Sequence, residues 1–187
     1  MREMLRALNR PKEAFKSGNT TLTVILVLLT VLVNSVLDPI LEYFFGKFGC
    51  ELDALQMLRL TALGLASYLA ICAVIWLVCR CFGSRASLKE HIQTWGMSFF
   101  PTLLCALVVG VTETFFYVFW NSIAWGVAFN VLFGGILLWK TVLYVIYLRE
   151  VAQLRGGRLL GAMVVICVFI VFLAWADTRL GLKSPVI

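Results

Sequence analysis

Charged residues and histidine are scarce in this sequence, and each shortage excludes a class of protein. Asp, Glu, Lys and Arg make up 14% of the 187 residues, whereas an average soluble domain carries about 25%. The single histidine has no second histidine with which to share a metal ion. Little polar sequence lies between the apolar runs, so no separate soluble catalytic domain can be built from it.

Apolar residues are abundant instead, and they are gathered into long runs. The sequence is 61% hydrophobic, and its mean hydropathy is +0.95. A helix of about 20 apolar residues spans a bilayer core of about 30 Å. Five runs meet this requirement: 22–41, 58–82, 99–120, 125–148 and 159–176. The sequence therefore predicts an all-α integral membrane protein with five transmembrane helices and one or two short interfacial helices.

The charged residues flank these runs and predict the domain organisation and orientation. We expect a cytoplasmic amphipathic segment at 1–19, a five-helix transmembrane domain at 20–178 and a short tail at 179–187. Basic residues dominate the N-terminal segment and the loops after the second and fourth runs. Because cytoplasmic loops are enriched in Lys and Arg, this pattern places the N-terminus inside and the C-terminus outside. Asp177 counts here with Arg179 and Lys183 as a charge at the outer end.

A helix at the membrane interface is predicted before the third run. Ser87 and Glu90 have the spacing of a capping box, in which each side chain binds the backbone of the other residue. An apolar stripe follows at helical spacing, and its Trp95 is expected at interface depth. Gly96 and Pro101 mark where this helix should turn into the third span. The stripe consists of Leu88, Ile92, Trp95 and Phe99.

Two stripes of small residues are typical of contacts between transmembrane helices. Each repeats every four residues, so that its members share one helix face. Small side chains let backbones approach closely, and an amide can form a hydrogen bond with the neighbouring helix. The stripes are Ala62, Ala66 and Ala70 in the second run and Gly126, Asn130 and Gly134 in the fourth.

Two ionisable residues stand inside the runs, where a charge is costly. Glu113 belongs to the third run and Lys140 to the fourth, at depths about 6 Å apart. A short connection joins the two runs, so they are expected to be neighbours and these side chains to form an intramembrane pair. Such a pair either lowers the cost of two buried charges or forms part of a proton or ion pathway.

The remaining polar and aromatic residues indicate no reaction. Three serines in or directly beside the runs lack a nearby histidine to activate them, and we expect no enzyme activity, metal or cofactor. The aromatic residues near the run ends are expected in interfacial belts. The serines are Ser35, Ser67 and Ser98, and the belt residues are Tyr117, Trp120, Trp125, Tyr144 and Tyr147.

Several short motifs resemble those of the YIP-domain family, named for Ypt-interacting protein. Residues 10–15 (RPKEAF) look like the opening motif of its bacterial members, and residues 83–90 (GSRASLKE), followed by Gly96 and Pro101, look like a second motif. The closing motif is similar in Trp139, Leu143, residues 149–151 and Ala162.

The resemblance implies a compact five-helix membrane domain with a cytoplasmic N-terminus. Eukaryotic members associate with Rab-type GTPases in vesicle traffic. This sequence has no long segment before the first run, so the resemblance favours a bacterial cytoplasmic membrane and an accessory, scaffold or organising role beside another membrane complex. The alternative function is a small transporter of lipid or ions that uses Glu113 and Lys140. Expected partners are membrane lipids and another membrane protein, without nucleic acid.

Overall fold

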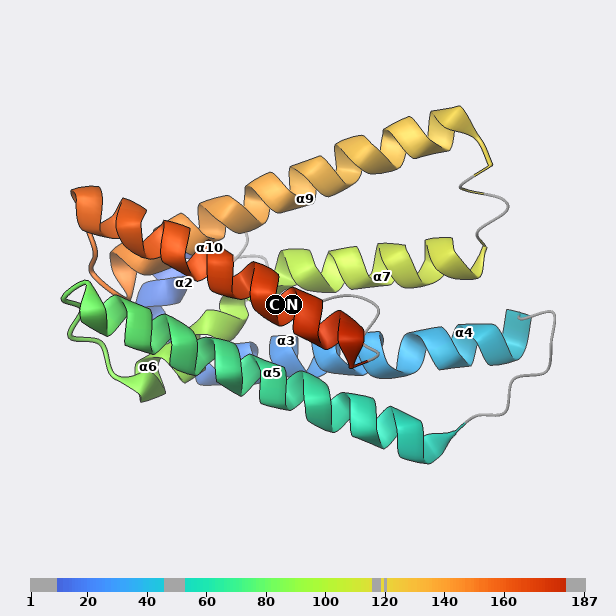
Figure 1. Cartoon of the computed structure of the whole chain (residues 1–187), viewed down its shortest axis with the longest axis horizontal. Helices are drawn as coiled ribbons and strands as arrows, with labels where there is room; N and C mark the ends of the chain where they lie inside the picture. Colours follow the sequence, from blue (N-terminus) through green and yellow to red (C-terminus); the bar gives the residue numbers. More distant parts are fainter. Residues whose placement is uncertain (1–9, 46–52, 116–118, 120, 181–187) are drawn as a thin grey trace.

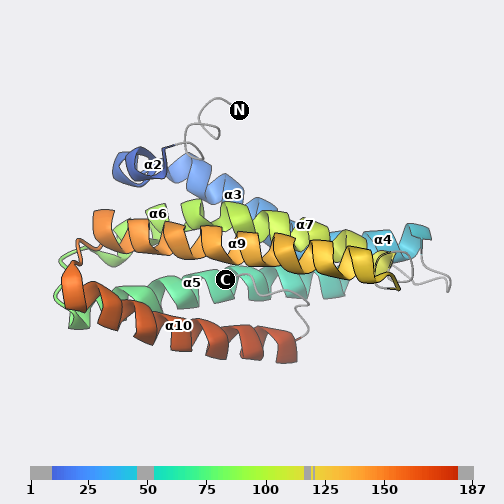
Figure 2. The ribbon, with the colours of Figure 1, turned by 90° about the horizontal axis from the view of Figure 1, so that it is seen from above.

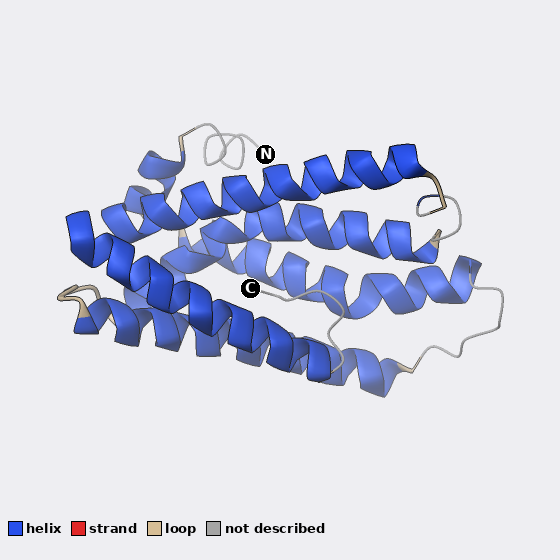
Figure 3. Cartoon of the chain, turned by 45° about the horizontal axis from the view of Figure 1, so that its top comes forward, coloured by secondary structure: helices blue, strands red, loops and turns tan. Residues whose placement is uncertain are grey.

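The computed structural model is helical in all the elements that it describes (Figure 3). It describes residues 10–45, 53–115, 119 and 121–180, except the side chains of Asp38, Glu42 and Glu113. The expected amphipathic helix within residues 1–9 and most of the 179–187 tail lie outside these residues.

Five helical segments are long and apolar enough to cross a membrane, as the sequence predicts. The first combines α3 (Thr20–Leu32), a wider π-helical turn η1 (Val33–Leu37) and α4 (Asp38–Phe45). The third, Leu88–Thr112, runs from α6 (Leu88–Trp95) through the 3₁₀ turn η2 (Gly96–Phe99) into α7 (Phe100–Thr114). The second, fourth and fifth are single helices: α5 (Ala54–Cys81), α9 (Ile123–Glu150) and α10 (Gly156–Arg179).

The long helices lie side by side along one axis, and the bundle has two distinct ends (Figure 1). One end holds the short helix α2 (Pro11–Ser17), α6 and the connections at 82–87 and 151–155; we call it the α6 end. The opposite end holds the C-terminus of α4 and the N-termini of α5 and α9. Figure 2 shows α2 and α10 on opposite sides of the bundle.

The short helix α2 is fixed to the bundle by one aromatic side chain and one ion pair. Phe15 is 3% exposed, and its ring lies 5.7 Å from that of Tyr147 in α9. The Nζ atom of Lys16 lies 3.3 Å from a carboxylate oxygen of Glu150. Gly18 then adopts a left-handed conformation at φ 57°, which glycine reaches without steric cost, and the chain turns into α3.

The core of the bundle lies where α5 faces α3, η1, α6 and α10, and its centre is on α5. Ile71, Cys72, Ile75 and Cys79 of this helix are all fully buried. Ile71, Ile75 and Cys79 are four residues apart, and Cys72 lies three residues before Ile75, so all four share one face of α5. The sequence predicts that the alanine stripe is the packed face of this helix, and the structure places a different face there.

Candidate functional site

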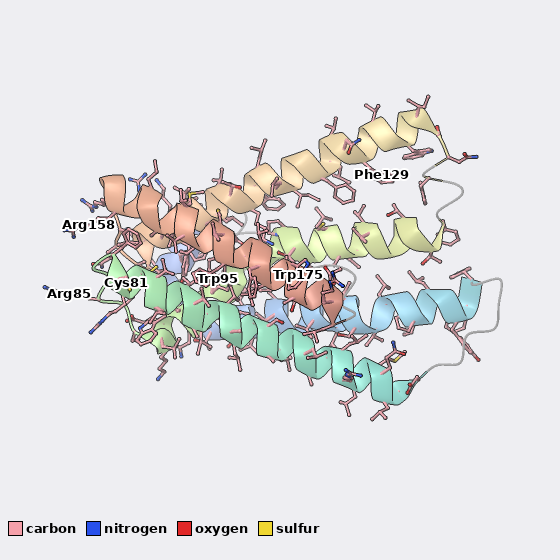
Figure 4. All side chains as sticks on the ribbon, in the orientation of Figure 1. Cys81, Arg85, Trp95, Phe129, Arg158 and Trp175 are labelled. Carbon is pink, nitrogen blue, oxygen red and sulfur yellow. The ribbon has the colours of Figure 1, made fainter. Side chains whose placement is uncertain are left out.

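A cluster of aromatic and polar side chains occupies the α6 end, inside the bundle. Trp95 is 1% exposed, and its ring lies 4.6 Å from that of Tyr144 and 4.8 Å from that of Tyr147. The His91 ring is fully buried and lies 5.8 Å from the Tyr147 ring. Together with Phe15, these residues join α2 and α6 to the C-terminal half of α9. Figure 4 labels Trp95 within the bundle, between α5 and α10 in that view.

This cluster corrects one prediction. Tyr144 and Tyr147 are 8% and 0% exposed, so they pack inside the bundle and do not belong to an interfacial belt, whereas the depth of Trp95 in the membrane stays a prediction. Aromatic rings suit both an interface and a close-packed core, so their chain positions alone do not distinguish the two. The belt residues Tyr117 and Trp120 lie outside the described residues, whereas Trp125 is 47% exposed near the opposite end.

Local hydrogen bonds determine where α6 begins. The Ser87 hydroxyl accepts a hydrogen bond from the Glu90 backbone N–H, and the Glu90 carboxylate accepts one from the Ser87 N–H at 2.7 Å. The predicted capping box is therefore confirmed. The Nδ1 atom of His91 donates to the Ser87 carbonyl oxygen at 3.1 Å, which adds a third bond to the same turn.

Two side chains from other helices hold the last turn of α6. The hydroxyl of Thr23 in α3 donates to the Gln93 carbonyl oxygen at 2.6 Å, and that of Tyr68 in α5 donates to the Ile92 carbonyl oxygen. Carbonyl groups at a helix C-terminus lack the usual intrahelical donor, so these hydroxyls provide it. The bend at Gly96 that the sequence predicts is present, and α6 lies at an angle to α7 in Figure 1.

The intramembrane lysine lies beside the aromatic cluster. The Lys140 ammonium lies 5.8 Å from the centre of the Tyr144 ring, a distance at which a cation is attracted to a ring face. The helices that carry Glu113 and Lys140, α7 and α9, are in contact. The Glu113 side chain lies outside the described part of the chain, so its pairing with Lys140 stays a prediction.

The two small-residue stripes face away from the rest of the described chain, so their contact with another helix stays a prediction. Ala62, Ala66 and Ala70 are exposed on α5. On α9, Asn130 and Gly134 are exposed and Gly126 is half-buried. Among the residues that the structure describes, no heavy atom would lie within 4 Å of a Cβ atom added at either glycine.

Asp177, which the sequence predicts to be a charge at the outer end, is buried inside the bundle. Asp177 is 2% exposed, and its Oδ1 atom accepts a hydrogen bond of 2.6 Å from the Ser67 hydroxyl in the middle of α5. A negative charge in the last turn of a helix is repelled by the negative end of the helix dipole. The position of Asp177 in the sequence therefore indicates that its carboxyl group requires a hydrogen-bond donor or a cation. The sequence could not identify that partner, which is 110 positions away.

The comparison with family models agrees with this architecture. The Yip1 domain model matches residues 4–176, nearly the whole chain. No curated protein and no solved structure matches the chain. Five apolar helices of spanning length and this match lead to one conclusion: the chain is a multi-pass membrane protein that belongs to the Yip1-domain family.

Proposed function

We propose that this protein is a non-enzymatic partner of another membrane protein, which it binds through the outer flank of α9 that carries Gly126, Asn130 and Gly134. The observation that carries the proposal is an exposed amide between two glycines within a transmembrane helix. Lipid tails offer no hydrogen-bond partner to an amide. A second helix could approach the two glycines closely and satisfy Asn130.

The experiment is photo-crosslinking in native membranes. A photoreactive residue at Leu137 lies seven residues from Asn130, on the same helix face, and Leu137 is 66% exposed. Val168 of α10, which is 65% exposed, is the matched control. We expect a specific protein adduct at Leu137 and only lipid adducts at Val168.

A companion substitution tests whether the small residues themselves make the contact. Gly134→Leu should abolish the adduct at Leu137, whereas Gly134→Ala should keep it. Neither should lower the thermal unfolding midpoint of the purified protein, because no heavy atom of the described residues lies within 4 Å of a Cβ atom added at this position. An equal yield of the Leu137 adduct in the wild type and in Gly134→Leu would refute the proposed surface. A lower unfolding midpoint for Gly134→Leu would indicate that this face of α9 packs inside the chain.

We further propose that the α6 end faces the cytoplasm of a bacterial cell. Basic residues gather there, including Arg85 and Arg158 (Figure 4), and such residues are enriched on the cytoplasmic side.

A membrane-impermeant maleimide, applied to intact cells, tests this orientation. We expect it to label Asn121→Cys at the opposite end and not Arg85→Cys at the α6 end. Both positions are exposed, and permeabilised cells, in which both should react, provide the control. Labelling of Arg85→Cys alone in intact cells would invert the orientation.

A further inference from the structure

The fifth span, α10, is the one that the rest of the chain covers least. Only 11% of the most apolar 18-residue stretch of α10 is buried, whereas 28% or more of the corresponding stretch is buried in each of the other four spans. Its buried residues are Ala162, Ile166 and Asp177. Because the first two are near the N-terminal end of α10, Asp177 is the buried contact in its C-terminal half.

The partner of Asp177 lies in the middle of α5. Ser67 is 13 residues from Ala54 and 14 residues from Cys81, the two ends of α5. At about 1.5 Å per residue, it lies about 20 Å from either end of that helix. The bond between Ser67 and Asp177 therefore joins α5 and α10 near the middle of the bundle.

The carboxyl group is only half satisfied by the described residues. Its Oδ1 atom accepts the hydrogen bond from Ser67, whereas its Oδ2 atom is buried and has no hydrogen-bond partner among them. A buried ionised carboxylate is costly unless a cation and several donors satisfy it. Among the described residues, no lysine or arginine forms an ion pair with Asp177.

The other titratable groups on the packed helices are engaged elsewhere. Arg179 of α10 lies 5.4 Å from the centre of the Trp175 ring. Lys140 of α9 lies over Tyr144. On the buried face of α5, Tyr68 bonds to Ile92 of α6, and that face otherwise carries the thiols of Cys72 and Cys79. On α9, Tyr147 is buried against Trp95, and Glu150 is paired with Lys16. The exposed groups are Arg59, Arg80 and Cys81 of α5, Arg149 of α9, and Arg158 and Cys167 of α10.

We propose that Asp177 and Ser67 form a proton-binding site inside the bundle, between α5 and α10, in which the protonated carboxyl group holds α10 against α5. When the proton leaves for water, the negative charge remains in a site where the described residues supply one donor and no cation, so the carboxylate moves toward water and α10 separates from α5. This site is independent of the partner surface on α9.

The first test uses dicyclohexylcarbodiimide, an apolar reagent that modifies protonated carboxyl groups. The full chain, reconstituted in liposomes, is treated at several pH values, and the adducts are located by mass spectrometry. We expect an adduct on Asp177 near neutral pH, with a yield that falls about tenfold for each pH unit above the midpoint of titration. The exposed carboxylates of Glu13 and Glu90 should remain unmodified, and Asp177→Asn should carry no adduct.

Infrared difference spectroscopy provides a second measurement that needs no reagent access. The wild-type protein should show a protonated carboxyl band that disappears as the pH rises and is missing from Asp177→Asn. No such band at any pH would overturn the proposal. A band that persists at alkaline pH would also overturn it, because the carboxyl group would then never release its proton.

The stability of the protein tests whether the proton controls the packing of α10. The folded state binds a proton that the exposed carboxyl group of the unfolded chain releases, so wild-type stability should fall as the pH rises through the titration of Asp177. Asp177→Asn is neutral at every pH and should lose this dependence, whereas Ser67→Ala should keep it. An identical pH dependence in wild type and Asp177→Asn would refute the coupling.

Discussion

Gly96→Ala is expected to lower the stability of the protein by about 1–3 kcal/mol, the usual cost of overpacking. A Cβ atom at this position would lie 2.5 Å from a methyl group of Val27 and 2.6 Å from that of Thr23. It would also lie 3.0 Å from the Thr23 carbonyl oxygen, a backbone atom that moves only if α3 moves. That movement would strain the hydrogen bond from Thr23 to Gln93, which holds α6 in place.

The matched control is Gly134→Ala in α9, where no heavy atom of the described residues lies within 4 Å of an added Cβ atom. Both glycines have helical backbones, and alanine is favoured over glycine in a helix by up to about 1 kcal/mol. We therefore expect a lower thermal unfolding midpoint in detergent for Gly96→Ala and an unchanged or higher one for Gly134→Ala. Val27→Ala should partly rescue Gly96→Ala, because it removes the nearest clashing methyl group. Equal midpoints for the two single variants would contradict the close approach of α3 and η2.

Trp95→Ala should cost about 3–5 kcal/mol, the range for truncating a large buried aromatic side chain. The substitution removes the ring that packs against both Tyr144 and Tyr147. It should therefore release α6 from α9 and weaken the site at which α2 is attached. Thermal unfolding in detergent measures the loss of stability, and limited proteolysis near residues 82–87 reports the release of α6.

Trp175→Ala is the control, because it removes a side chain of the same size from an exposed position. Trp175 is 56% exposed on α10. The substitution should change stability by no more than about 0.5 kcal/mol. Trp95→Phe should cost less than Trp95→Ala, since it keeps a ring and removes an indole N–H that has no partner among the described residues. An effect of Trp175→Ala as large as that of Trp95→Ala would contradict the prediction that stability depends on the burial of Trp95 against α9.

The sequence predicts local features of this protein well. The capping box of Ser87 and Glu90 is confirmed because both partners lie within one helical turn, where spacing alone determines contact. The five spans are also confirmed, because length and hydropathy suffice to identify a transmembrane helix. The site features that join distant residues, such as Asp177 with Ser67, were not predicted.

The small-residue stripes show why helix faces could not be assigned. In a soluble helix the polar face identifies the side that meets water. In a membrane span, lipid and protein both accept apolar side chains, so the sequence pattern does not distinguish the packed face from the lipid face. On α5, the predicted face of Ala62, Ala66 and Ala70 points outward, whereas the face that contains Ile71 and Ile75 is packed.

The sequence by itself determined that the chain is an all-α membrane protein with five spans, because transfer into lipid depends on the composition and length of each run. It also fixed the start of α6, which depends on residues three positions apart. Only the tertiary structure decided that Trp95, Tyr144 and Tyr147 are core residues, that the α9 stripe faces away from the rest of the described chain, and that Asp177 contacts Ser67. Each of these outcomes depends on how the helices rotate and tilt against one another, which is set by the close fit of many side chains at once.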